Sequence, residues 1–281
     1  MNQYLENLVR VMRQSHKRDI HEYDEVFLMK TLAKRLAATG IECSIAYAEQ
    51  ISDSTEEADA FSDLLQIPYS EFFRNQLTFS LLEQWILPSL AADKRKAGSG
   101  EVRVWSAGCA AGQEIYSIAM LIDEMNESAE DKVAFRLFAT DYSSKELALA
   151  QHGVYHEDVV RNVRQKHIWK YFAAEGDSYR LNDRIKNLVD FSEYDLLDKE
   201  SSSPPASIFG DFDLVFCSNL LFYYRTEVQQ EILGKICRSM SPNGYLISGE
   251  AERDIVSRHE CFRAVAPPSA IFQRTKHRGS L

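Results

Sequence analysis

The sequence predicts an α/β fold with a mostly parallel sheet, preceded by an all-helical N-terminal domain. Three features of the chain lead to this prediction. Strand-like and helical segments alternate after residue 100, the first 75 residues contain no convincing strand, and two short strands around Pro267 and Pro268 end the chain. Such alternation is typical of parallel sheets covered by helices on both faces. The last two strands indicate an antiparallel hairpin at the sheet edge.

The N-terminal helical domain is assigned to residues 1–75. Leu28, Leu32 and Leu36 recur at helical spacing, and Gly40 is a natural end for the helix that carries them. Two further short helices are expected over residues 43–51 and 57–67. A long amphipathic stretch with Pro88 inside it follows, and we assign residues 76–100 to a linker helix that ends at the breaker sequence "GSG".

The α/β domain is expected over residues 101–281. Its predicted strands are residues 102–108, 135–141, 187–195, 211–219 and 244–250. Helices are expected between most of them, over 112–126, 143–151 and 225–240. The interval before the third strand is too long for a simple crossover, so we predict an inserted subdomain at about 155–190, built from a helix and a small hairpin around "NDR".

Composition narrows the class of protein. The chain has 281 residues, 45% of them hydrophobic, with a net charge of −10. That charge disfavours nucleic acid as a partner, because phosphate binding needs a basic surface. No apolar run approaches the ~20 residues that span a bilayer, and the N-terminus does not resemble a signal peptide, so we expect a cytoplasmic protein without membrane insertion. Five scattered cysteines without a CxxC pair indicate neither disulfides nor a metal site.

The segment "RVWSAGCAAGQEIYS" (103–117) joins the first strand to a helix through a turn of small residues. Such a turn lets a ligand approach the backbone closely. Gly108 and Gly112 are four residues apart and the middle glycine of a dinucleotide fingerprint is missing, so the match to that motif is poor. The alternative is that this segment is only a connecting turn between a strand and a helix and binds no ligand.

Two carboxylates near this turn indicate the kind of ligand. Asp141 ends the second strand, where a carboxylate can accept hydrogen bonds from both ribose hydroxyls of an adenosine, or can instead cap the next helix. Glu114 lies at the start of the expected helix, where a bound phosphate would need a hydrogen-bond donor. A carboxylate there repels phosphate and attracts a cation. Alternatively, Glu114 only complements the helix dipole. Together they favour S-adenosylmethionine, which carries an ammonium and a sulfonium group but no phosphate.

Polar residues at other strand ends are further candidates. Asp195 follows the third strand, where it could accept from an adenine amino group or merely start a turn. Asn219 follows the fourth strand among apolar neighbours, so its amide needs partners. Tyr223 could line a reaction cleft or cover the sheet edge. Arg74 lies beside Phe72 and Phe73 and is either a functional cation or a surface arginine.

Taken together, these motifs resemble the CheR-type methyltransferases, which methylate glutamate side chains of chemotaxis receptors. The likeness extends over nearly the whole chain and is clearest in "SEFFRNQLTF", "RVWSAGCAAGQEIYSIAM", "FATD", "DFSEYDLL", "FDLVFCSNLLFYY" and "SPNGYLISGEAE". The resemblance implies a Rossmann-like S-adenosylmethionine-dependent methyltransferase domain that forms glutamate methyl esters and releases S-adenosylhomocysteine. Another acceptor on the same scaffold, or a non-catalytic sensor of the cofactor or its product, is the alternative.

The resemblance also implies roles for individual residues. Glu114 holds the amino group of the cofactor, Asp141 the ribose, and Asp195 with Leu196 the adenine. The remaining cofactor contacts implied are Ser70, Arg74, Gly108, Ser218 and Asn219. Arg74 and Tyr223 are the implied catalytic residues. The sequence departs from the family at several positions, among them Ser70, Ala111, Gln113, Ile115, Asp195, Ser218 and Glu250.

The implied partner is the cytoplasmic helical region of methyl-accepting chemotaxis receptors, approached by a monomer. Basic residues of the N-terminal domain could face this acidic partner, or form an ordinary solvated surface; they are Arg10, Arg13, Lys17, Arg18, Lys30, Lys34 and Arg35. In the family the inserted hairpin can grip a receptor tail peptide. The loop "AAEGDSYRLNDR" is short here, so we expect that the tail-binding form is missing.

Overall fold

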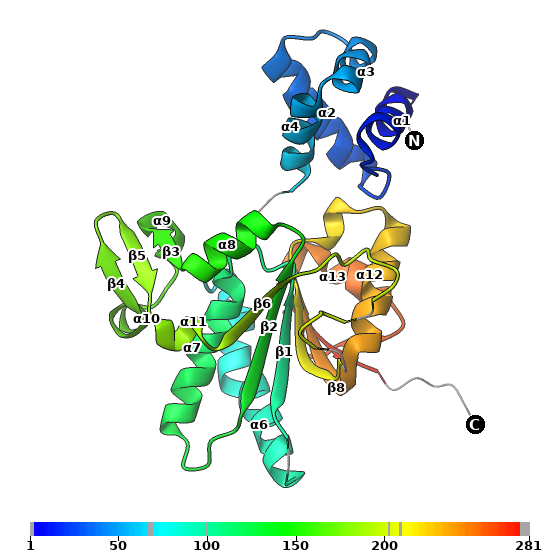
Figure 1. The fold of residues 1–281 in the computed structure, drawn as a ribbon. Helices are drawn as coiled ribbons and strands as arrows, with labels where there is room; N and C mark the ends of the chain where they lie inside the picture. The colour runs from blue at the N-terminus through cyan, green and yellow to red at the C-terminus, as the bar shows by residue number, and fades with distance from the viewer. Residues whose placement is uncertain (1–2, 67–69, 99, 202, 208–209, 276–281) are drawn as a thin grey trace, which may run out of the picture. The chain divides into compact units, whose positions relative to one another are not determined.

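The computed structural model describes residues 3–66, 70–98, 100–201, 203–207 and 210–275. The chain forms two compact units (Figure 1). The first, which we call the helical unit, contains Met1–Ile67 together with Leu221–Gln230. The second, the sheet unit, contains Pro68–Leu220 and Glu231–Leu281. The helical unit thus ends earlier than the expected residue 75 and gains a segment from within the range 101–281.

Four helices build most of the helical unit: α1 (Gln3–His16), α2 (Glu25–Thr39), α3 (Ser44–Asp53) and α4 (Thr55–Leu65). The Asp24 carboxylate accepts hydrogen bonds from the Val26 and Phe27 N–H groups at the start of α2. Gly40, at φ 72°, ends that helix. The expected all-helical character is confirmed. Helix α1 was not among the predicted helices, although its buried side chains recur at helical spacing; they are Leu5, Leu8, Val9 and Met12.

A buried polar network stabilises the helical unit. The Glu57 carboxylate accepts hydrogen bonds from Arg35 Nε at 2.8 Å, Arg35 Nη2 at 2.6 Å and the Tyr47 hydroxyl at 2.6 Å. The Arg35 guanidinium holds the pKa of Glu57 below its ordinary value. A buried carboxylate is tolerated when it is paired and fully hydrogen-bonded, as here. Arg35 therefore has an intramolecular role in its own unit.

The sheet unit is built on seven strands in the order β6-β2-β1-β7-β8-β10-β9. Their bounds are β1 (Val102–Ala107), β2 (Phe135–Asp141), β6 (Val189–Glu193), β7 (Phe212–Cys217), β8 (Met240–Ser248), β9 (Phe262–Ala264) and β10 (Ile271–Arg274). The first five strands of this order are parallel, and β10 pairs antiparallel with both β8 and β9. The predicted mostly parallel sheet with a terminal antiparallel hairpin is confirmed.

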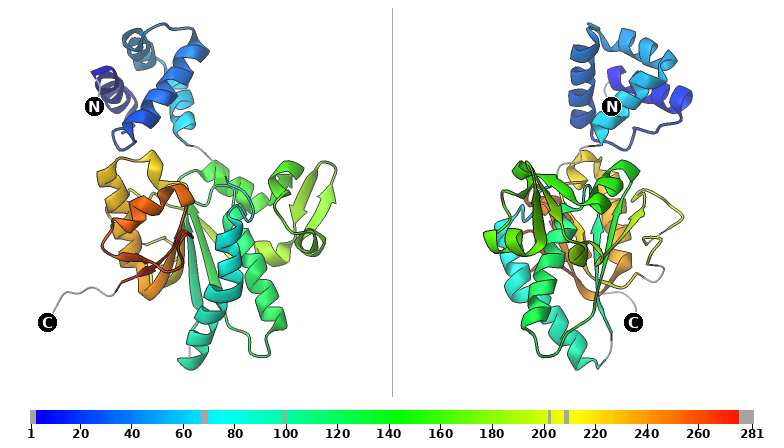
Figure 2. Two further views of the ribbon diagram at one scale, coloured as in Figure 1. Left: turned by 180° about the vertical axis from the view of Figure 1, so that it is seen from behind. Right: turned by 60° about the vertical axis from the view of Figure 1, so that its left-hand side comes forward.

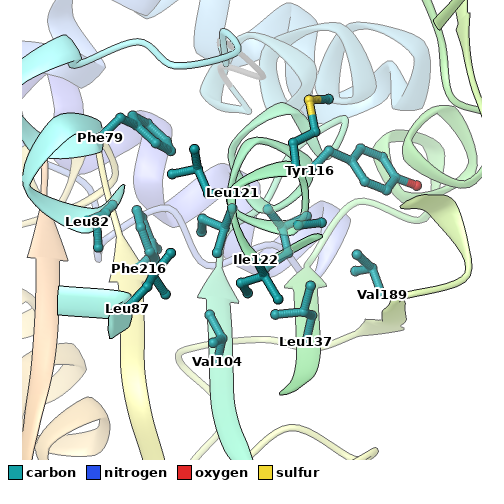
Figure 3. Close-up of a cluster of buried hydrophobic side chains, with 14 of the residues drawn as sticks. Phe79, Leu82, Leu87, Val104, Tyr116, Leu121, Ile122, Leu137, Val189 and Phe216 are labelled. Atoms are coloured by element: carbon teal, nitrogen blue, oxygen red, sulfur yellow. The ribbon is translucent and has the colours of Figure 1, made fainter. Parts of the chain in front are cut away.

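Helices cover both faces of this sheet, as Figure 2 shows. Helices α6 (Leu87–Lys96) and α7 (Gln113–Ser128) lie on one face, and α12 (Thr226–Ser239) and α13 (Arg253–Ser257) lie on the other. A hydrophobic core lies between the sheet and the helices on each face. Successive side chains of a strand point to opposite faces, so they contribute alternately to these two cores. Val104 and Leu137 pack toward α7 in the core drawn in Figure 3, and Phe216 lies beside Leu87.

The expected linker helix packs into the sheet unit. The stretch runs through α5 (Gln76–Leu81), a π-helical turn (Leu82–Ile86) and α6 without a break. Leu82, Ile86 and Leu87 are fully buried in the core on that side of the sheet (Figure 3 shows Leu82 and Leu87). Pro88 lacks an N–H donor, and it is the second residue after the π-helical turn, an irregularity of the kind found where the hydrogen-bond ladder of a helix is interrupted.

The inserted subdomain is a three-stranded sheet in the order β3-β5-β4, accompanied by short helices. Its elements are β3 (Val154–His156), α9 (Glu157–Val160), α10 (Gln165–Tyr171), β4 (Phe172–Glu175), β5 (Ser178–Leu181) and α11 (Asp183–Lys186). The hairpin turns at Gly176 and Asp177, so its predicted placement around "NDR" is wrong. The Asn182 side chain instead accepts from the Ile185 N–H and begins α11.

Candidate cofactor site

The turn after β1 is fixed to the end of β2. The N–H groups of Gly108 and Cys109 both donate to the Thr140 carbonyl, at 2.8 and 2.9 Å. Gly108 and Gly112 have φ values of 73° and 84°, which favour glycine. A Cβ atom on Gly112 would lie 3.0 Å from the Ala150 Cβ, so this glycine also permits close packing of α7 on α8 (Ser144–His152).

Asp141 holds the same turn with its side chain. Its Oδ2 accepts from the Ala110 N–H at 2.8 Å, and its Oδ1 accepts from the Ser143 N–H at 2.9 Å. The cap of α8 is Ser143, whose hydroxyl accepts from the Glu146 N–H, so Asp141 is not the helix cap. Burial raises the pKa of Asp141, and the backbone hydrogen bonds oppose that rise. A carboxylate has about four acceptor sites, so it keeps capacity to accept from a ligand hydroxyl.

We expect Asp141→Ala to weaken cofactor binding and to lower the free energy of unfolding by about 1–3 kcal/mol, because the Ala110 N–H loses its acceptor. Calorimetric titration with S-adenosylhomocysteine and urea unfolding would measure the two effects. Ser143→Ala is the matched control: it removes a helix cap but leaves the Asp141 carboxylate, so only stability should fall. Unchanged binding by the Asp141 variant would contradict its assignment to the ribose.

Glu114 lies in the first turn of α7 as a partly buried carboxylate. Its Oε1 accepts from the Ser106 hydroxyl at 3.1 Å. Burial raises the pKa of Glu114 to about 7; hydrogen bonds from Ser218 and Ser106 oppose the rise, the charge of Glu252 adds to it, and the charge of Arg74 lowers it. Burial thus makes the ionised form of Glu114 unfavourable in the free protein. A cationic ligand beside the carboxylate would stabilise that ionised form.

The turn after β7 carries Ser218 and Asn219. Ser218 hydrogen-bonds to Glu114, which joins this turn to the start of α7. Asn219 has φ 60°, an unusual conformation for a residue other than glycine. Its N–H donates to Glu252 Oε2 at 2.8 Å, and the Gly249 N–H donates to the same oxygen at 2.8 Å. Glu252 was not among the residues predicted from the sequence; it is fully buried, whereas Glu250 two residues away is exposed.

Asp195 and Leu196 follow β6 in a tight turn. Asp195 is exposed, and its Oδ1 accepts from the Leu197 N–H at 2.8 Å, so the turn-forming role that the sequence left open is present. The Lys235 ammonium donates to the Asp198 carbonyl and lies 5.3 Å from the centre of the Tyr194 ring. Lys235 was also missed from sequence, because its partners are about forty residues away.

The "FFR" segment is anchored by its two aromatic side chains. The Phe72 ring lies 4.9 Å from the Tyr155 ring, and the Phe73 N–H donates to the Ser117 hydroxyl of α7 at 3.1 Å. Arg74 follows with an exposed side chain, and its charge reaches Glu114, whose pKa it lowers. Ser70 is half-buried at the beginning of the segment.

Tyr223 belongs to the helical unit. Its carbonyl accepts from the Asp24 N–H at 2.8 Å, and its ring centre lies 4.8 Å from that of Phe27. Next to it, Tyr224 forms an antiparallel bridge with Tyr23 and stacks on its ring at 5.2 Å. The sheet unit thus brings together Arg74, Glu114, Asp141, Ser218 and Asn219 around the ends of β1, β2 and β7, whereas Tyr223 is fixed by the N-terminal helices.

A family model described as "CheR methyltransferase, SAM binding domain" matches residues 69–270. The chain belongs to the CheR methyltransferase family. It is 36% identical over 186 residues to chemotaxis protein methyltransferase 1 of Pseudomonas aeruginosa, covering 64% of each protein. It is 30% identical over 243 residues to the chemotaxis protein methyltransferase of Escherichia coli, covering 84% of this chain and 77% of that protein.

A third relative is an uncharacterized 104.1 kDa protein of Rhodobacter capsulatus, 28% identical over 276 residues. That match covers 95% of this chain but 28% of the relative. The chain therefore spans less than two thirds of the Rhodobacter and Pseudomonas relatives. The predicted family is confirmed, and so is S-adenosylmethionine as the cofactor, because the matched CheR domain is the one that binds it.

The residues around the turn fit this cofactor. An ammonium group suits Glu114, whose ionised form lies in surroundings that penalise it. A ribose suits Asp141, whose carboxylate lies at the end of β2 and is held in place by hydrogen bonds from the Ala110 and Ser143 N–H groups. Across the residues that the structure describes, no three His, Cys, Asp or Glu side chains are grouped so that they could hold a metal ion. Within the same residues, no helix is long and apolar enough to cross a membrane.

Proposed function

We propose that the protein transfers a methyl group from S-adenosylmethionine to glutamate side chains of chemotaxis receptors and so forms glutamate methyl esters. The observation that carries the proposal is the partly buried Glu114 carboxylate, joined to Ser106 and Ser218, in a chain of the CheR family. This carboxylate favours a cationic amino-acid group over a phosphate.

The bound cofactor supplies a methyl group activated by attachment to a sulfonium. Glu114 binds the ammonium group, and Asp141 accepts hydrogen bonds from the ribose. Asp195 and Leu196 frame the adenine. The Lys235 ammonium stabilises the turn that carries them by donating to the Asp198 carbonyl. Ser70, Gly108, Ser218 and Asn219 complete the cofactor contacts. These assignments rest on the family motifs and agree with the strand ends at which the residues lie.

The acceptor needs no general base. A glutamate side chain has an ordinary pKa near 4.3, so it is already an anionic nucleophile at neutral pH. Catalysis then depends on holding the carboxylate oxygen in line with the methyl group, which alone can contribute a large part of the rate enhancement. We assign this positioning to Arg74, whose guanidinium can bind a carboxylate in bidentate fashion, and to Tyr223.

The proposed partner is the helical cytoplasmic region of a chemotaxis receptor, met by a monomer in the cytoplasm. The relatives named chemotaxis protein methyltransferases support this proposal. The basic face expected on the helical unit is narrower than its sequence indicated, because Arg35 pairs with Glu57 and Arg18 pairs with Asp59. Lys30 and Lys34 are exposed on α2 and are the better candidates for contact with acidic receptor helices.

Incorporation of a labelled methyl group into receptor-containing membranes would test the proposed reaction. We expect label that is released as methanol by mild alkali, because carboxyl methyl esters are hydrolysed under those conditions whereas N-methyl groups are not. Label that resists alkali would indicate another acceptor. Cofactor binding without any label transfer would indicate a sensor and would contradict the proposed enzyme.

A further inference from the structure

Glu252 is a fully buried carboxylate outside the set of residues assigned to contact the cofactor. It ends the short 3-10 helix Glu250–Glu252, which follows β8, and none of its surface is exposed. Its Oε2 accepts two backbone hydrogen bonds, from Asn219 and from Gly249, each at 2.8 Å. Charged side chains are almost never fully buried unless they are satisfied in this way, so the position has a specific use.

The two hydrogen bonds join the ends of neighbouring strands. Cys217 of β7 is paired with Ser248 of β8, and Glu252 fastens the residues that follow each strand. The fit is tight: a Cβ atom on Gly249 would lie 2.9 Å from both the Asn219 Oδ1 and the Glu252 Oε2. Glu252 thus holds Asn219 in its left-handed conformation and fixes the turn from which Ser218 reaches Glu114.

The charge of Glu252 also acts on the site. It opposes ionisation of Glu114, so the two carboxylates lie within electrostatic reach of each other in surroundings of low polarity. The other groups that face Glu114 are the hydroxyls of Ser106 and Ser218, the guanidinium of Arg74, and the thiols of Cys109 and Cys217. Burial raises the pKa of both thiols, which keeps them uncharged at neutral pH.

We infer that Glu252 is a positioning residue of the cofactor site: it fixes the Ser218–Asn219 turn and adds a second negative charge toward the ammonium end of the cofactor. The inference deepens the proposed function and rests on it. The expected ligand is a nucleoside that carries an amino-acid group. Its ammonium group would contact Glu114, and the negative charge of Glu252 would act on it from the other side of the Ser218–Asn219 turn.

Two variants separate the two roles. In Glu252→Gln the amide oxygen can keep both backbone hydrogen bonds while the charge is removed. In Gly249→Ala the charge remains, but the added Cβ displaces the Asn219 and Glu252 side chains. Gly249 has φ −69°, which alanine adopts without strain, so the effect comes from the contact and not from the backbone. Glu250→Gln, at an exposed position two residues away, is the matched control.

Calorimetric titration of the full chain with S-adenosylhomocysteine between pH 5.5 and pH 8.5 tests the inference. Affinity of the wild type should rise with pH as Glu114 ionises, with a midpoint near its pKa of about 7. Glu252→Gln should move this midpoint to lower pH and weaken binding at pH 8 roughly tenfold. Gly249→Ala keeps the charge, so it should weaken binding while moving the midpoint less than Glu252→Gln does, and it keeps the inference testable if the glutamine variant does not fold.

A Glu252→Gln variant that matches the wild type in midpoint and in affinity at pH 8 would overturn the inference and leave the proposed function intact. The same holds for a Gly249→Ala variant of unchanged affinity. A wild type that fails to bind S-adenosylhomocysteine at any pH would overturn the proposed function itself, and the inference with it.

Discussion

Glu114→Gln is expected to remove most of the affinity for S-adenosylmethionine while making the free protein more stable above neutral pH. Loss of one partner of a hydrogen-bonded, buried charge pair costs about 2–5 kcal/mol of binding, or roughly 30-fold to several thousand-fold. The amide oxygen can still accept from Ser106 and Ser218, so the fold should keep its local contacts. The expected result is a well-folded protein without its ligand.

The gain in stability follows from the direction of the pKa change. Folding raises the pKa of Glu114 from 4.5 to about 7, so the folded protein holds this proton more tightly than the unfolded chain does. Stability is therefore greatest below pH 4.5 with respect to this group, and it is lost as pH rises toward 7. The loss amounts to at most about 3 kcal/mol, and the glutamine variant does not suffer it.

Urea unfolding at pH 5 and pH 8, combined with calorimetric titration, would measure both effects. The variant should exceed the wild type in free energy of unfolding at pH 8 by more than it does at pH 5. Glu130→Gln changes an exposed carboxyl just beyond α7 and serves as the control that should alter neither quantity. Tight cofactor binding by Glu114→Gln would refute its role as the partner of the ammonium group.

Arg74→Ala is expected to reduce methyl transfer strongly and leave the fold intact. The side chain is exposed, so its removal creates no cavity in the core, and the neighbouring Phe72 and Phe73 keep the segment in place. A charge-assisted hydrogen bond to a carboxylate contributes about 1.5–3 kcal/mol, which corresponds to roughly 10- to 150-fold in kcat/KM. The loss in kcat/KM should be larger still if the acceptor carboxylate is also misaligned in the variant.

Initial rates of methyl incorporation, with circular dichroism to check folding, would measure this effect. Arg74→Lys keeps the charge but loses the planar guanidinium, so it should recover only part of the activity. Arg95→Ala is the control, because it removes an exposed arginine from the last turn of α6. Unchanged turnover in Arg74→Ala would defeat the assignment of this residue to catalysis.

The sheet was predictable because its strands carry their own signal. Strands such as Phe135–Asp141 are apolar runs between helical segments, and they end in polar residues at the edge where α/β sheets bind ligands. For this reason Asp141 and Asn219 could be proposed as site residues from the sequence, and Glu114 from the turn that follows the first strand. The position of a polar residue at a strand end is a local property, and it can be inferred without knowing the tertiary contacts.

The features that the sequence missed depend on distant partners. Glu252 and Lys235 look like ordinary surface charges until Asn219 and the Asp198 carbonyl are brought to them by the fold. Arg35 was assigned to a basic face because Glu57 lies 22 residues away. The hairpin was misplaced because alternation continues past Leu181, and only the cap at Asn182 turns the chain into a helix.

The membership of Leu221–Gln230 in the helical unit has a consequence for how the protein can be divided. The chain leaves the sheet unit after Leu220, pairs with residues 22–24 through the backbone of Tyr223, Tyr224 and Arg225, and then returns within α12. A protein trimmed of its first 67 residues would keep the whole sheet, but Tyr223, Tyr224 and Arg225 would lose the backbone partners that residues 22–24 supply. The N-terminal helices and Leu221–Gln230 therefore form one unit built from two distant parts of the chain, so removing the first part should expose the second.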